Sequence, residues 1–323
     1  MLELVNISNL PFEVRQLLGG EKAVLDDFLA RHRLDGLELF LCGPRDEAMF
    51  PAALIHGVHL CFWPAWVSFW RQDAVKMARD YGGQDAVREM FGGERVEAWL
   101  ELWRQNIREA ADAEAKYLVL HVSETPLSEL CARSFTTISD AEVIDATLEL
   151  VAALSDVIPE DCQLLFENLW WPGLTLRRTD LAERLLSRSK HQNCGFLLDT
   201  GHLMSTNLDL VGEADSAAFV VAAYRALGSL GKRVYGLHLH QSQSGAYVRT
   251  RMSTPGDWRW PRDSAKISEY VAQVDAHRPF QTSAVRRIVE AIQPEYLVHE
   301  FLPATFAEWE EKVHTQRHAL GWE

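Results

Sequence analysis

The sequence predicts a single α/β domain, residues 1–323, folded as a (β/α)8 TIM barrel. Short apolar runs alternate with amphipathic stretches along nearly the whole chain, a pattern that favours a parallel sheet with helices outside it. Several of these runs end in His, Asp or Glu, and the C-terminal ends of barrel strands carry the active site. The composition, 47% hydrophobic and 24% charged, is that of an ordinary globular protein.

The apolar runs and the stretches between them predict the individual elements. Strands are expected at residues 4–8, 36–41, 56–62, 117–122, 163–168, 195–199, 234–240 and 296–301. The clearest helical patterns lie at residues 21–31, 95–113, 140–158 and 304–318, with Ser139 as the N-cap of the third.

Two long inserts interrupt this spacing, one at residues 63–94 after the third strand and one at residues 241–274 after the seventh. Both follow the C-terminal end of a strand, which is the active face of a barrel. Long loops there are usually lids or substrate walls. The alternative is a packed surface excursion without a catalytic role.

The net charge of −14 argues against a polyanionic partner. An acidic chain repels DNA and anionic membranes, so nucleic acid is disfavoured and a small-molecule substrate is expected. No apolar run approaches the roughly 18 residues that would cross a membrane, and no signal-peptide pattern is seen. The five cysteines are scattered without a Cys-x-x-Cys motif, as expected in a reducing cytoplasm. The sequence leaves open whether the chain forms a homo-oligomer.

Side chains that bind metal ions recur at the ends of the predicted strands. In chain order they are His59, His121, Glu167, Asp199 with His202, His238 with His240, and Glu300. A buried carboxylate such as Glu167 costs free energy unless it is paired or binds a metal ion. Since oxygen and imidazole ligands together suit divalent ions, we expect one to three ions of Mn, Zn, Fe, Co or Mg.

The strand period separates candidate ligands from packed residues. His238 and His240 are two apart and face the same side; His238 is assigned to the metal, and His240 to a substrate or to support of the ligands. His299 and Glu300 are adjacent, so only Glu300 faces inward and His299 is expected to pack in the core.

A D-x-H pattern and several tryptophans complete the candidate site. Asp275-Ala276-His277 follows the second insert and is either a pair of metal ligands or a surface turn. Aromatic faces pack well on the apolar or planar parts of a ligand. The tryptophans expected to wall the substrate pocket are Trp63, Trp66, Trp170 and Trp171.

This pattern resembles the xylose isomerase-like TIM barrels, which include sugar and sugar-phosphate isomerases and epimerases as well as apurinic-site endonucleases. The resemblance extends from Gly36-Leu37-Glu38-Leu39 through Glu300, and its most specific segments are residues 166–168, 198–202, 237–240 and 298–300. In the epimerase branch it implies one Mn²⁺ or similar ion, held at Glu167, Asp199, His238 and Glu300. His202 would touch the substrate, and the two glutamates would move protons through a metal-stabilised enediolate.

The endonuclease branch implies three zinc ions. Its ligand positions match, in order, His59, His121, Glu167, Asp199, His202, His238, Asp275, His277 and Glu300. That branch has a shorter gap before the D-x-H pattern and a basic DNA-binding face, whereas the epimerase branch usually has a second glutamate where this chain has Gly173. Multinuclear-iron oxidases that modify peptides are third relatives with similar ligands.

From the residues and the resemblance we predict a divalent-metal-dependent isomerase or epimerase of carbohydrate metabolism, acting on a sugar or sugar-phosphate-like substrate. Glu167, Glu300 and His202 are its expected catalytic residues. The alternative is a multinuclear-metal hydrolase of a small phosphoester, in which His59 and the D-x-H pair bind metal directly.

Overall fold

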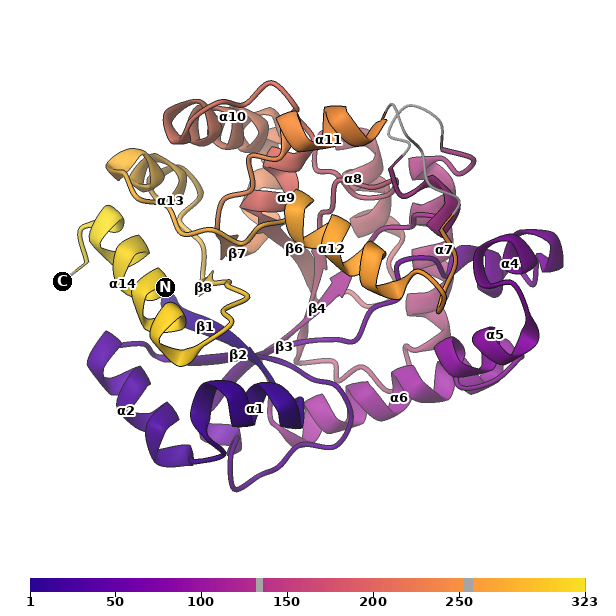
Figure 1. Ribbon diagram of the computed structural model, residues 1–323, viewed down its shortest axis with the longest axis horizontal. Coiled ribbons are helices and arrows are strands. Elements are labelled where there is room, and N and C mark those ends of the chain that lie inside the picture. Colours follow the sequence, from indigo (N-terminus) through magenta and orange to yellow (C-terminus); the bar gives the residue numbers. More distant parts are fainter. Residues whose placement is uncertain (132–135, 253–257, 323) are drawn as a thin grey trace.

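The computed structural model describes residues 1–131, 136–252 and 258–322, and its eight parallel strands close into a barrel (Figure 1). The strands are β1 Leu2–Ser8, β2 Gly36–Phe40, β3 Ile55–His59, β4 Tyr117–His121, β5 Gln163–Glu167, β6 Cys194–Asp199, β7 Val234–Leu239 and β8 Tyr296–His299. Each strand pairs with the next along the chain, and β1 pairs with β8 to close the ring. The predicted fold class is confirmed.

Helices follow the strands and surround the barrel (Figure 1). They are α1 Pro11–Leu18, α2 Lys22–His32, α3 Val67–Trp70, α4 Ala74–Tyr81, α5 Gln84–Phe91, α6 Val96–Asp112, α7 Asp140–Ala153, α8 Thr179–Arg188, α9 Thr200–Ser205, α10 Glu213–Ala226, α11 Gly245–Met252, α12 Ser264–Val274, α13 Arg286–Ile292 and α14 Phe306–Leu320. The predicted helices correspond to α2, α6, α7 and α14. Ser139 caps α7 in a reciprocal capping box with Glu142, which satisfies two backbone N–H groups at the helix start.

The inserts contain helices of their own. Residues 63–94 include α3, α4 and α5, and residues 241–274 include α11 and α12, with residues 253–257 outside the described part of the chain. The two ends of the second insert meet in an antiparallel bridge. There the Gln241 amide donates to the Arg278 carbonyl at 2.8 Å, and the Arg278 amide donates back at 3.1 Å. This excursion therefore returns to its starting point at the end of β7.

The barrel interior is filled by a separate apolar cluster. It consists of Leu4, Tyr117, Val119, Leu165, Leu197 and Val298, all buried. Two glycines, Gly57 and Gly236, also face this layer, because a Cβ atom added at either would meet the side chain of a member. Since side chains two apart on a strand share a face, the residues two positions beyond this layer also point inward, at the C-terminal rim.

The described residues include no helix long and apolar enough to cross a membrane. All five cysteines are free thiols, as the scattered spacing predicted.

Replacing Gly57 by alanine tests how tightly the interior layer is packed. The new Cβ would overlap the ring of Tyr117, a buried residue on the neighbouring strand. We expect Gly57→Ala to lower the free energy of unfolding by about 1–3 kcal/mol because overpacking forces side chains from their preferred rotamers. Urea denaturation measures it. Gly212→Ala is the control, since its Cβ would have no neighbour within 4 Å; equal losses in both variants would contradict the expectation.

Candidate metal centre

Six inward-facing residues lie one strand repeat above the apolar layer of the barrel. They are His59 above Gly57, His121 above Val119, Glu167 above Leu165, Asp199 above Leu197, His238 above Gly236 and Glu300 above Val298. All belong to the set predicted from the sequence. In a closed barrel all inward-facing side chains point toward the barrel axis. The alternation of side chains along each strand therefore brings residues from six strand ends together.

The first ligand group joins β3, β4 and β5. The Nε2 atoms of His59 and His121 lie 3.0 Å apart, and each lies 3.2 Å from Glu167 Oε2. His59 Nδ1 lies 2.9 Å from the Leu60 carbonyl oxygen, and this contact fixes the ring with Nε2 toward the group. Two imidazole nitrogens and one carboxylate oxygen thus face a common point, an arrangement that suits a divalent ion.

Glu167 and Asp199 each belong to more than one group of potential metal ligands. Glu167 Oε1 lies 3.0 Å from His202 Nδ1 and 3.6 Å from His238 Nδ1. Asp199 groups with Glu167 and His202 on one side and with His238 and Glu300 on the other, with ligand atoms within 4.8 Å of one another. The two oxygens of Glu167 therefore face different sets of nitrogens.

The D-x-H pair joins this cluster from the segment that follows the second insert. Asp275 Oδ2 lies 3.0 Å from His202 Nε2, and His277 stacks on His240 with ring centroids 4.1 Å apart. Ser242 Oγ donates to Asp275 Oδ1 at 3.1 Å and accepts the Ala276 amide at 3.0 Å. These contacts follow directly from the Gln241–Arg278 bridge, so the long sequence gap before Asp275 does not separate it from the barrel ligands.

Several buried ligand atoms have no hydrogen-bond partner among the described residues. They are both carboxylate oxygens of Glu167, Glu300 Oε2, and the Nδ1 atoms of His238 and His240. Glu167 is 0% exposed, and of the described groups only imidazole nitrogens at 3.0–3.6 Å offset the large desolvation cost of its carboxylate. A divalent cation would satisfy these atoms together, so the residues present fit a bound metal.

Mutual charge compensation sets the pKa values of the cluster. Burial raises the pKa of Glu167, but His121 and His238 hold that pKa well below its usual range. Burial lowers the pKa of His202 and His238, and neighbouring carboxylates, Asp199 beside His202 and Glu300 beside His238, raise it well above 6.5. The pKa of His240 rises to about 10, against the effect of burial, through its contact with Asp199.

One supporting residue, Glu38 on β2, was not among the predicted site residues. His238 Nε2 lies 2.7 Å from Glu38 Oε1, and the Tyr117 hydroxyl donates to Glu38 Oε2 at 2.8 Å. A carboxylate behind a ligand histidine fixes its ring and raises its basicity. The sequence contains a signal for Glu38, because, like Glu167, it is a charged residue within an apolar strand.

Two polar side chains, Asn168 and Thr200, hold the ends of β5, β6 and β7 in register. Asn168 Oδ1 accepts the Asp199 amide at 2.9 Å, and its Nδ2 donates to the Asp199 carbonyl at 3.1 Å. The Thr200 hydroxyl contacts the His238 and His240 carbonyls. His299 faces away from the cluster, as predicted, and is buried against Glu3 and Gln316.

A cavity of about 190 Å³ opens over the cluster. Its polar lining includes Asn6, Ser8, Glu13 and Glu38, and its apolar lining consists of Phe40, Phe62, Val271 and Leu302. Among the described lining residues there is no lysine or arginine. Phe62 is 43% exposed and Leu302 62% exposed, so apolar surface is available at the entrance.

The four predicted tryptophans lie outside this lining. Trp170 packs 5.1 Å from the His202 ring and 4.4 Å from Trp171, and both indoles are buried. Trp66 donates through Nε1 to the Ser123 carbonyl, and Trp63 to the Met90 carbonyl. Their contacts with the ring of Trp99 place Trp63 and Trp66 in an aromatic cluster behind the rim. The aromatic residues at the cavity are Phe40 and Phe62.

The sequence profile of the xylose isomerase-like TIM barrel family matches residues 30–292. The chain belongs to this family. The resemblance predicted from the ligand pattern is thereby confirmed. No curated protein matches the sequence at a significant level.

Solved structures of two enzyme types share the fold. Endonuclease IV from Thermus thermophilus superposes with a TM-score of 0.54 at 14% identity over 100% of both chains. D-psicose 3-epimerase, determined in the presence of D-fructose, gives 0.50 at 12% identity over 100% of this chain and 98% of the other. The 3-keto-D-glucoside 4-epimerase of E. coli, in its apo form, has the same values. At these identities the similarity shows the fold, so the choice of chemistry rests on the site itself.

Ion binding is expected to release protons. Neighbouring carboxylates raise the pKa of His202 and of His238 and raise that of His240 to about 10, so the metal-free protein keeps protons on these rings to higher pH than free imidazole does. Ligand nitrogens must lose those protons to bind an ion, and the affinity should therefore fall as the pH is lowered. Titration calorimetry with Zn²⁺ or Mn²⁺ in phosphate and in Tris buffer measures the protons released. Identical heats in both buffers would contradict this expectation.

Glu38→Gln is expected to weaken ion binding without removing a ligand. The neutral amide keeps the size of the side chain but loses the charge that orients His238, so the affinity should fall about 10–100-fold. Competition with a chromogenic chelator measures it. Tyr117→Phe removes only the hydroxyl that supports Glu38 and should have a smaller effect; a loss as large as that of Glu38→Gln would argue against the charge of Glu38 as the cause.

Proposed function

We propose that the chain is a metal-dependent hydrolase of a small phosphoester that works with more than one divalent ion. The observation that carries this proposal is the placement of Glu167. Its Oε2 faces His59 and His121, while its Oε1 faces His202 and His238. A carboxylate with oxygens directed at two ligand groups is suited to bridge two ions.

The ligand groups divide among three positions. His59, His121 and Glu167 would hold one ion, and Asp199, His238 and Glu300 a second, with Glu167 Oε1 3.6 Å from His238 Nδ1. The third set comprises His240, Asp275 and His277, and His202 lies between this set and Glu167, with its Nε2 3.0 Å from Asp275 Oδ2. Ions bound in such sites supply Lewis acidity toward phosphoryl oxygens and lower the pKa of water.

The remaining residues position the ligands and the substrate. Glu38 holds the His238 ring, and Ser242 holds Asp275. Phe40, Phe62 and Leu302 offer apolar surface to the organic part of the substrate. The cavity volume of about 190 Å³ and the net charge of −14 favour a small molecule over duplex DNA as the substrate. A cytoplasmic location and self-association stay predictions.

The isomerase or epimerase predicted first is the second candidate. The absence of lysine and arginine from the described lining of the cavity favours it, because a neutral polyol needs no cation. Its mechanism requires two carboxylates to reach the substrate. Glu300 lines the cavity, whereas Glu167 is 0% exposed and surrounded by histidines. The burial of Glu167 is the reason for preferring the hydrolase.

Elemental analysis combined with activity assays tests this choice. We expect more than one ion per chain, with hydrolysis of bis(p-nitrophenyl) phosphate as a general probe. His59→Ala should lose about one ion and reduce hydrolysis about 100-fold or more. Residues that only support a metal ligand typically change activity about 10–100-fold, and removal of a ligand itself should have at least as large an effect. His56→Gln is the control, because His56 lies on the same strand and contacts the Asp35 carbonyl instead.

Other outcomes would separate the alternatives. A single ion retained in His59→Ala, together with isomerisation of ketoses and no phosphodiester hydrolysis, would establish the second candidate instead. Bound iron with oxygen consumption and no hydrolysis would point to the multinuclear-iron oxidase type.

A further inference from the structure

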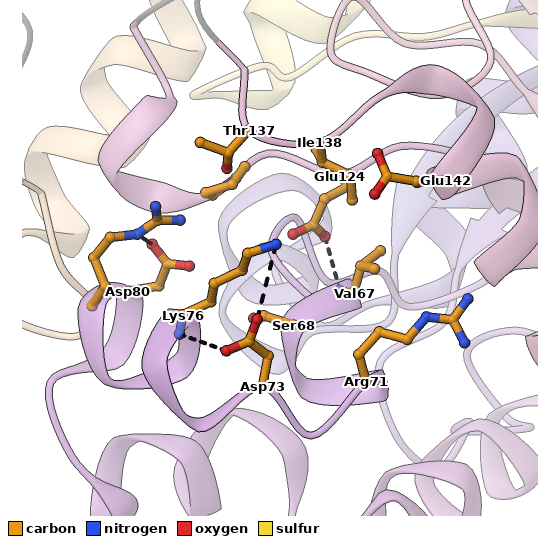
Figure 2. Close-up of a pocket in the computed structure, with 12 residues that line it drawn as sticks. Val67, Ser68, Arg71, Asp73, Lys76, Asp80, Glu124, Thr137, Ile138 and Glu142 are labelled. Carbon is orange, nitrogen blue, oxygen red and sulfur yellow. Dashed lines mark hydrogen bonds and ion pairs between the residues drawn. The ribbon is translucent and has the colours of Figure 1, made fainter.

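A second cavity, of about 120 Å³, lies between the first insert and the segments that follow β4 (Figure 2). Its polar lining includes Ser68, Lys76, Arg79 and Asp80 from the insert, and Glu124 and Thr137 from the facing side. None of these residues belongs to the metal cluster. Since one water occupies about 30 Å³ of liquid volume, the cavity has room for a small molecule.

Buried polar atoms around this cavity lack partners among the described residues. Ser68 is 5% exposed, and its hydroxyl has no hydrogen-bond partner. Asp80 is 1% exposed; its Oδ1 contacts Arg79 and Ser128 at 3.3 Å each, but its Oδ2 has no partner. Arg79 pairs with Asp80 through Nε at 3.3 Å and with Glu129 through Nη1 at 3.4 Å, but its buried Nη2 has no partner. Buried donors and acceptors without partners are costly, and a ligand that carries both an acceptor and a donor group would satisfy them together.

Two other charged residues of the cavity, Lys76 and Glu124, make few contacts with charged groups of the protein. Among the described residues, Lys76 Nζ has a single ion-pair contact, at 3.9 Å from Asp73 Oδ2, and Figure 2 shows its side chain extending toward Glu124. Glu124 accepts the Trp66 and Val67 amides through Oε2, at 2.6 and 3.1 Å. Arg71, by contrast, is held by a bidentate pair with Glu149.

We propose that this cavity binds a small zwitterion, a molecule with one carboxylate and one ammonium group, such as a free amino acid with a small side chain. The Ser68 hydroxyl, Lys76 Nζ and Arg79 Nη2 are the donors for its carboxylate. Asp80 Oδ2 and the Glu124 carboxyl group are the acceptors for its ammonium. This pairing gives partners to the unsatisfied donors and acceptors together, whereas a simple anion leaves Asp80 Oδ2 without a donor and a simple cation leaves the Ser68 hydroxyl and Arg79 Nη2 without an acceptor.

The site is distinct from the metal centre but anchored next to it. Glu124 lies three positions beyond His121 on the same segment, and the Trp66 indole donates to the Ser123 carbonyl at 2.9 Å. The Thr125 amide donates to the Pro64 carbonyl at 2.7 Å. Zwitterion binding therefore does not depend on the proposed hydrolase activity and can be measured without an enzymatic assay.

Calorimetric titration of the purified full-length protein with glycine and L-alanine tests the proposal. Propionate and ethylammonium, each carrying one of the two groups, are the matched ligands. We expect both amino acids to bind and each half-molecule to bind at least about 10-fold more weakly, since each leaves buried donors or acceptors without a partner.

Variants assign the binding to the cavity. Ser68→Ala and Lys76→Met should weaken alanine binding about 10-fold or more, and Asp80→Asn should remove the preference for alanine over propionate. Lys22→Met is the control, because Lys22 pairs with Asp26 on the surface of α2. Circular dichroism and metal content, unchanged in all variants, exclude misfolding.

Three results would overturn the proposal. They are the absence of binding by both amino acids at millimolar concentration, equal binding of propionate and alanine, and alanine binding that is unaffected by both Ser68→Ala and Lys76→Met. Should Asp80→Asn fail to fold, the propionate comparison on the wild-type protein still decides the point.

Discussion

The buried carboxylate of Glu167 is the interaction on which the rest of the site depends. It is 0% exposed, and four imidazoles surround it, with nitrogens 3.0–3.6 Å from its oxygens. In a barrel interior a charge of this kind is tolerated only when its partners remain in place, and removing one partner of a buried pair typically costs about 3–5 kcal/mol. The imidazoles need the carboxylate for the same reason. The carboxylate and the imidazoles therefore depend on one another, and a substitution at one of these strand ends destabilises the residues at the others.

The sequence predicts the barrel and most of the cluster, because the two-residue period of a β-strand determines both which residues fill the interior and which ligands point into it. A side chain two positions beyond an inward core residue must also point inward, so Leu165 predicts the direction of Glu167, and Leu197 that of Asp199. Glu38, which contacts His238, also faces the barrel interior, but it lies within its strand and not at the strand end, where barrel ligands are expected.

Contacts that depend on loop closure were not predictable in this way. Asp275 and His277 reach the cluster because Gln241 pairs with Arg278 across an insert that contains two helices. No local pattern encodes that pairing. Similarly, the tryptophans were assigned to the pocket from their number and position, but Trp63 and Trp66 pack around Trp99, and phenylalanines line the cavity instead. Aromatic residue type alone does not distinguish core from pocket.

The first insert also bears on how the active face works. Long loops at this face of a barrel often close over substrate, and that was one expectation for residues 63–94. The buried carboxyl group of Glu124 accepts the amides of Trp66 and Val67, and burial raises the pKa of Glu124 to about 8. An opening movement at the start of the insert would break both hydrogen bonds and leave two backbone donors and a carboxyl group unpaired. Because that cost recurs at each opening, the segment around Trp66 is better suited to act as a fixed wall beside His121 than as a moving lid.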